Sequence, residues 1–97
     1  MYEKNIFSLN GDGERYHIFE YKSNNEINNL PFWQDGPNNY VQIKIAKVLN
    51  NLKVDKKYFP DFKQNYKYYF VERYDHSKLY LIYDSKKKRI YIIEEIM

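Results

Sequence analysis

Three strand-like runs in the last third of the chain constrain its fold more than any other feature. They are rich in tyrosine and β-branched residues, and the short turn-like stretches "DHS" and "SKKK" separate them. Connections this short join antiparallel neighbours. The sequence therefore predicts a three-stranded antiparallel meander with strands at about residues 66–74, 78–84 and 89–96.

One main amphipathic helix is predicted before the meander, at about residues 39–52. Its apolar residues recur at helical spacing, and Pro37 lies just before its start, where a missing N–H costs least. The apolar stripe consists of Val41, Ile45, Val48, Leu49 and Leu52. Such a helix needs an apolar surface to pack on, and the meander is the expected one.

The first part of the chain predicts a β-hairpin and then a short helix. Asn-Gly and Asp-Gly in "NGDGE" supply the positive φ angles of a tight turn between two strands. Ser23 and Glu26 form a Ser-x-x-Glu capping box, and Pro31 ends a helix of about two turns. Because no repeat or long linker is evident, residues 1–97 are predicted to form a single α+β domain.

Opposite charges set the register that we predict for the meander. Asp75 is expected opposite Lys78, which also lies opposite Glu95. Asp84 is expected opposite Arg89. Side chains alternate across a strand, so one face holds most of the Leu, Ile and Phe residues and is expected to pack against the helix. The other face mixes tyrosine with basic residues and is expected to be half-exposed.

The half-exposed face is the predicted binding surface, because tyrosine and arginine are enriched in protein-binding hot spots. The aromatic loop "LPFWQDGP" is expected to add anchors beside it. The predicted binding residues are Tyr69, Arg73, Lys78, Tyr80, Arg89 and Tyr91 on the sheet, with Phe32 and Trp33 in the loop. Two alternatives stay open. In the first, the N-terminal hairpin covers this face. In the second, the tyrosines of this face stack on RNA bases while its cations neutralise phosphates.

Charge and composition narrow the function classes. Residues 1–40 carry three Lys or Arg and six Asp or Glu, a balance of −3, whereas residues 41–97 carry 13 and 7, a balance of +6. A basic half suggests phosphate binding, but lysine is also the usual solubilising residue. Lys, Asn, Ile and Tyr have A/T-rich codons, so base composition accounts for part of the tyrosine content. The same bias suggests a low-GC bacterium, a phage or another mobile element.

No cofactor, metal site or catalytic residue is predicted. The chain has no cysteine, and His17 and His76 lie on different elements without ligand spacing. No phosphate-binding loop or nucleophile elbow is present. No apolar run approaches the roughly 18–20 residues that span a bilayer, so we expect a cytoplasmic protein with no membrane association.

One enzymatic alternative rests on the segment "VERYDHSKLYLIY", which holds Glu72, Arg73, His76, Lys78 and Tyr80 close together. This segment and the order of elements are faintly similar to the RelE-type toxins, in which helices precede a basic C-terminal meander. The resemblance implies a metal-independent ribonuclease that uses a base, an acid and phosphate-binding cations. The chain departs from those toxins at its end, "IIEEIM", where they carry a basic or aromatic catalytic tail.

The leading hypothesis is a small non-catalytic binding protein that occupies the surface of a partner protein. An inhibitor or anti-defence protein of a phage or mobile element, such as an anti-CRISPR protein, would act in this way. The alternative is an RNA-binding protein or a ribonuclease toxin of a toxin–antitoxin pair. A homo-oligomer that pairs sheet faces or edges is a third hypothesis.

Overall fold

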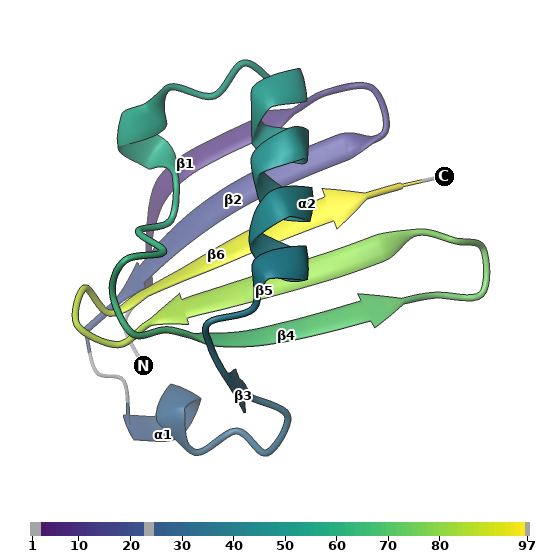
Figure 1. Ribbon diagram of the computed structural model, residues 1–97. Helices are drawn as coiled ribbons and strands as arrows, with labels where there is room; N and C mark the ends of the chain where they lie inside the picture. Colours follow the sequence, from purple (N-terminus) through teal and green to yellow (C-terminus); the bar gives the residue numbers. More distant parts are fainter. Residues whose placement is uncertain (1–2, 23–24, 97) are drawn as a thin grey trace.

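A computed structural model describes residues 3–22 and 25–96 and confirms the predicted α+β class (Figure 1). The described strands form one antiparallel sheet in the order β1-β2-β6-β5-β4-β3. The strands are β1 (Glu3–Asn10), β2 (Glu14–Tyr21), β3 (Gln34–Asp35), β4 (Lys67–Glu72), β5 (Lys78–Asp84) and β6 (Arg89–Glu95). The helices are α1 (Asn25–Asn28), α2 (Asn39–Asn51) and the 3-10 turn η1 (Lys56–Tyr58). No helix in these described ranges is long and apolar enough to cross a membrane.

The N-terminal hairpin extends the sheet instead of covering it. Strand β2 pairs with β6 along its whole length, from Glu14 opposite Glu95 to Glu20 opposite Arg89. The expected alternative, in which the hairpin lies over a face of the meander, is therefore wrong. Gly13 takes a φ of 78° in the β1–β2 turn, where a side chain would be strained.

Helix α1 is shorter than the sequence predicts. It spans four residues, about one turn, and ends before Pro31 as expected. Ser23, the first residue of the predicted capping box, lies outside the described residues.

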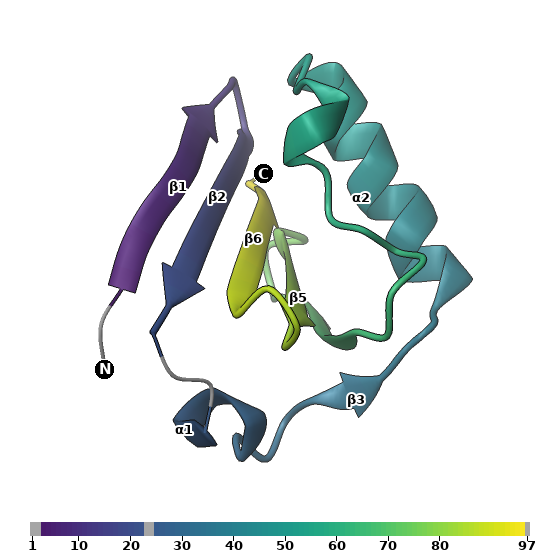
Figure 2. The ribbon, with the colours of Figure 1, turned by 90° about the vertical axis from the view of Figure 1, so that its left-hand side faces the viewer.

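Helix α2 and the segment after it cover one face of the sheet (Figure 2). Asn38 caps the helix by accepting a 3.1 Å hydrogen bond from the Val41 N–H. The buried residues of α2 are Val41, Ile45, Val48 and Leu49. They pack against a bed of alternating tyrosine and isoleucine, all at most 1% exposed: Tyr16, Ile18, Tyr80, Ile82, Tyr91 and Ile93. Beyond the helix, the Tyr58 ring stacks on Phe7 at 4.1 Å between centroids.

Two of the three predicted charge pairs are confirmed, and one is wrong. Lys78 lies opposite Glu95 and Asp84 lies opposite Arg89. Lys78 on β5, however, lies opposite Glu72 on β4 and not opposite Asp75. Strand β4 therefore ends earlier than predicted, and Arg73 to Ser77 form a loop.

Local hydrogen bonds explain the longer loop between β4 and β5. The Arg73 N–H donates to the Ser77 carbonyl at 2.8 Å, and His76 takes a φ of 68° between them. The Asp75 carboxylate accepts from the Ser77 hydroxyl at 2.6 Å and from the Ser77 N–H at 3.0 Å. These hydrogen bonds lower the pKa of the Asp75 carboxyl. The His76 N–H also donates to the Arg73 carbonyl at 3.0 Å, so Arg73 to His76 form a β-turn that ends on a left-handed residue.

The register error changes which side chains share a face. A shift of three residues is odd, so each face of β4 lies beside the opposite set of β5 side chains from the one predicted. Tyr68 and Phe70 still lie on the α2 side, and Tyr69 on the other, as predicted. Helix α2 also packs on the other face of β5 and β6 from the one expected. Tyr80 and Tyr91, predicted to be half-exposed, are 0% and 1% exposed beneath α2.

Hydrogen bonds satisfy the hydroxyls of several core tyrosines. The Tyr80 hydroxyl donates to Glu95 Oε1 at 2.9 Å, and the Tyr16 hydroxyl donates to the Tyr58 carbonyl. The Tyr66 hydroxyl accepts from the Asn38 N–H and from Gln42 Nε2. Burial raises the pKa of Tyr16 and of Tyr80, and the hydrogen bond to Glu95 raises that of Tyr80 further.

Alanine substitutions on the two faces test this packing. Tyr80→Ala is expected to lower the free energy of unfolding by about 3–5 kcal/mol, because a fully buried aromatic ring is lost. Tyr69→Ala on the opposite face is expected to cost about 1 kcal/mol. Urea unfolding followed by circular dichroism measures both. A larger loss for Tyr69→Ala would contradict the packing of α2 on the Tyr80 face.

Candidate functional site

The sheet face opposite α2, called the open face, carries apolar and aromatic side chains. It is made of the residues that alternate with the buried ones along the strands. The open face consists of Arg15, His17 and Phe19 on β2, Ile90, Ile92 and Glu94 on β6, Leu79, Leu81 and Tyr83 on β5, and Lys67, Tyr69 and Val71 on β4.

The centre of the open face is a row of half-exposed side chains across four strands. Leu81 lies opposite Ile92 on one side and Tyr69 on the other, and Ile92 lies opposite His17. All four side chains are half-exposed. In the described part of the chain, no helix runs along this side of the sheet (Figure 2). Apolar groups at the centre of the sheet therefore remain in contact with water.

The loop between α1 and β3 covers one end of the open face. Trp33 stacks on Tyr83 at 5.7 Å between centroids, and its Nε1–H donates to the Ile27 carbonyl at 2.7 Å. Tyr83 and Ile27 are only 1% and 3% exposed as a result. Phe32, at the edge of this cover, contacts the Tyr69 ring at 4.8 Å and stays 37% exposed. Trp33 is thus part of the packing, whereas Phe32 extends the open face.

The structure brings three of the predicted binding residues together. Tyr69, Phe32 and Trp33 form one aromatic group where the loop meets the open face. Tyr80 and Tyr91 lie on the other side of the sheet, in the core. They are therefore not part of an exposed surface.

The predicted cations are dispersed. Arg73 is exposed in the loop between β4 and β5, and Lys78 lies on the α2 side between Glu72 and Glu95. Arg89 Nε lies 3.3 Å from Glu20 Oε1. Burial raises the pKa of Tyr91, and the positive charge of Arg89 opposes this rise. None of these three cations lies on the open face.

The structure adds site residues that the sequence prediction assigned to the core. Leu79, Leu81, Ile90 and Ile92 were expected beneath the helix but lie on the open face. Both faces of β5 and β6 are apolar in sequence, so aliphatic content alone does not identify the buried one. The position of the tyrosines could have identified the buried face, because a buried tyrosine hydroxyl needs hydrogen-bond partners that a helix and its flanking loops supply.

The residues of the catalytic alternative are only partly brought together. His76 Nδ1 lies 3.2 Å from Glu72 Oε2 in the exposed loop. Tyr80, however, is fully buried and donates its hydroxyl to Glu95. Within residues 3–22 and 25–96, no group of three or more His, Asp or Glu side chains is placed to hold a metal ion.

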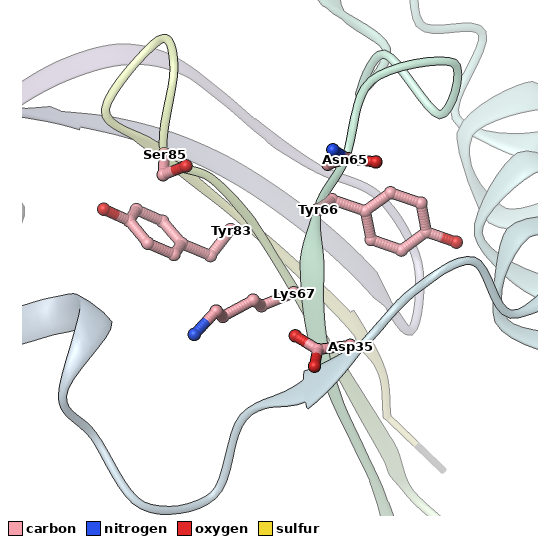
Figure 3. Close-up of a pocket in the computed structure, with 6 residues that line it drawn as sticks. All are labelled: Asp35, Asn65, Tyr66, Lys67, Tyr83 and Ser85. Atoms are coloured by element: carbon pink, nitrogen blue, oxygen red, sulfur yellow. The ribbon is translucent and has the colours of Figure 1, made fainter.

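A small pocket lies at the covered end of the sheet, between β4, the β5–β6 turn and β3 (Figure 3). Its lining residues are Asp35, Asn65, Tyr66, Lys67, Tyr83 and Ser85. The side chains of Lys67 and Tyr83 point to one side of β4, and Tyr66 points to the other, toward α2. The pocket holds about 110 Å³, well below the roughly 300–1,000 Å³ of ordinary small-molecule sites. We assign no ligand to it.

Comparison of the chain with protein-family models, with curated proteins and with solved structures finds no match in any of the three.

Substitutions in the aromatic loop test the distinction between cover and exposed surface. Trp33→Ala is expected to lower the free energy of unfolding by about 3 kcal/mol, because the Tyr83 stack and the Ile27 hydrogen bond are both lost. Phe32→Ala is expected to cost about 1 kcal/mol or less. Equilibrium unfolding of both variants gives the comparison. Equal losses would mean that Phe32 is as much a part of the packing as Trp33.

Proposed function

We propose that this chain is a small non-catalytic protein that binds a partner protein through the open face. The observation that carries the proposal is the half-exposed apolar row in the middle of the sheet, where Leu81, Ile92 and Tyr69 contact water. A partner that covers this row removes apolar area from water, at roughly 25 cal/mol per Å². Contiguous apolar surface on a protein is a common mark of an interaction site.

The composition of the open face supports a protein partner. Its centre is aliphatic and aromatic, and charged residues such as Arg15, Lys67 and Glu94 lie toward its border. An apolar centre with a polar rim is the usual anatomy of a protein–protein interface. Tyr69 and Phe32 are the natural anchors, because aromatic side chains dominate interface energetics.

The distribution of cations favours protein over RNA. Single-stranded RNA requires aromatic rings beside a basic groove. Arg73 lies in the β4–β5 loop, and Lys78 and Arg89 lie on the α2 side, so none of the three shares the open face with Tyr69, the predicted binding tyrosine that is still half-exposed. The cations of the open face, Arg15 and Lys67, lie on separate strands at its border and form no basic groove. A small inhibitor, such as an anti-defence protein of a phage, needs only a surface that covers part of its target and no catalytic group.

Affinity capture with variants of the tagged chain tests the proposal. Leu81→Lys places a charge at the centre of the open face and is expected to weaken partner recovery at least about tenfold. Asn50→Lys adds the same charge on the exposed side of α2 and is the matched control. Both variants are first checked for an unchanged circular dichroism spectrum. The readout is the amount of each protein recovered from extracts of the native host.

Equal recovery of the partner by wild type and Leu81→Lys would contradict the proposal. The salt dependence separates the RNA alternative. An apolar interface is expected to lose little affinity between low and moderate salt. A log–log slope that falls by about 0.7 for each neutralised phosphate would instead indicate RNA binding.

A further inference from the structure

The outer edge of β4 is only partly paired. Strand β3 contributes two residues, with Gln34 opposite Tyr68 and Asp35 opposite Lys67. Strand β4 continues to Glu72. Among the described residues, no strand pairs with Tyr69 to Glu72 on the side away from β5.

Two backbone hydrogen bonds show which groups of β4 point outward. The Tyr66 carbonyl accepts from the Gly36 N–H at 3.0 Å, so residue 66 points toward β3. The Arg73 N–H donates to Ser77, so residue 73 points toward β5. Because backbone groups alternate along an antiparallel strand, the N–H and C=O of Phe70 and Glu72 point outward, beyond the end of β3.

Exposed apolar side chains gather on the segments that border this edge. The exposed large apolar residues of the described chain are Leu30, Phe32, Tyr40, Ile43 and Tyr74. The first two belong to the loop before β3, the next two to the first turns of α2, and the last to the β4–β5 loop. Tyr40 contacts Phe70 on the α2 side, at 5.8 Å between ring centroids, and Phe32 contacts Tyr69 on the open face. Apolar surface thus lies on both sides of the edge.

The other edge of the sheet differs from β4. Strand β1 is interrupted by a bulge between Asn5 and Phe7, and its exposed Asn5 and Ser8 side chains bond to each other. Bulges and polar side chains protect an edge strand from further pairing. Strand β4 has a short regular edge with apolar neighbours, so it is the better candidate for added pairing.

We propose that the outer edge of β4 binds an extended peptide segment of a partner protein as an added β-strand. The strand would pair with the backbone of Phe70 and Glu72, in line with β3, which already shows this pairing in the chain itself. Its alternate side chains would contact Tyr40 on one face and Tyr69 with Phe32 on the other, so apolar residues are expected on both sides. This inference rests on the proposed function and names the form of the partner.

A matched pair of substitutions at Glu72 tests the inference. Its side chain is 47% exposed and its N–H points outward, so proline removes the outward donor at a position that an edge strand tolerates. Glu72→Ala removes the same side chain and its contact with His76 but keeps the N–H. The probe is a peptide selected on the wild-type chain from a phage-displayed library of random linear peptides.

The selected peptides are expected to carry alternating apolar residues and to bind wild type and Glu72→Ala with similar Kd. Glu72→Pro is expected to bind at least about tenfold more weakly. In the wild type, the bound peptide is expected to slow hydrogen exchange at the Phe70 and Glu72 amides. This second readout does not depend on the stability of any variant.

Several outcomes would overturn the inference. These are equal binding to Glu72→Pro and Glu72→Ala, protection confined to β1 or to amides elsewhere, and no selected peptide at all. A dimer of the chain alone that Glu72→Pro abolishes would assign the edge to a second copy instead. If the captured partner is lost with Leu81→Lys but no peptide protects Phe70 and Glu72, the inference is wrong and the proposed function stands.

Discussion

Buried tyrosine hydroxyls are the constraint on which the rest of this structure depends. A tyrosine ring can fill a core, but its hydroxyl must find a hydrogen-bond partner there. The Tyr66 hydroxyl accepts from the Asn38 N–H and from Gln42, which ties the start of α2 to the sheet. The Tyr16 hydroxyl bonds the Tyr58 carbonyl and so holds the segment after the helix. The sheet face that carries Tyr16, Tyr80 and Tyr91, called the tyrosine face, is therefore the one that α2 and the segment after it cover.

The open face stays uncovered because α2 packs on the tyrosine face. One helix and one connecting segment cover the tyrosine side of the sheet, and the α1–β3 loop covers only one end of the other side (Figure 2). Leu81 and Ile92 remain half-exposed in the middle of the sheet. The same loop supplies β3, which stops after two residues and leaves the edge of β4 beside Phe32. Face and edge thus meet at Tyr69, where a single partner could contact both.

The sequence predicted the elements better than their faces. Helix α2 and strand β5 lie where their patterns placed them, and the Asp84–Arg89 pair is confirmed. The β4 register failed because Glu72 and Asp75 are both acidic and three residues apart, so either satisfies Lys78. Hydrogen bonds inside the β4–β5 loop decide which of the two lies opposite Lys78, and charge pairing alone does not predict them. Of the candidate site, Tyr69 and Phe32 were predicted, whereas the aliphatic centre was assigned to the core.

Helix α2 buries the tyrosine face of the sheet and leaves the opposite face in water. Methyl relaxation measured by NMR with a soluble gadolinium chelate tests it directly, because the paramagnetic effect falls steeply with distance from solvent. We predict strong broadening of the methyl groups of Leu79, Leu81 and Ile92 and protection of those of Ile82 and Ile93. Equal broadening of the two sets, or protection of Leu81 and Ile92, would contradict the account.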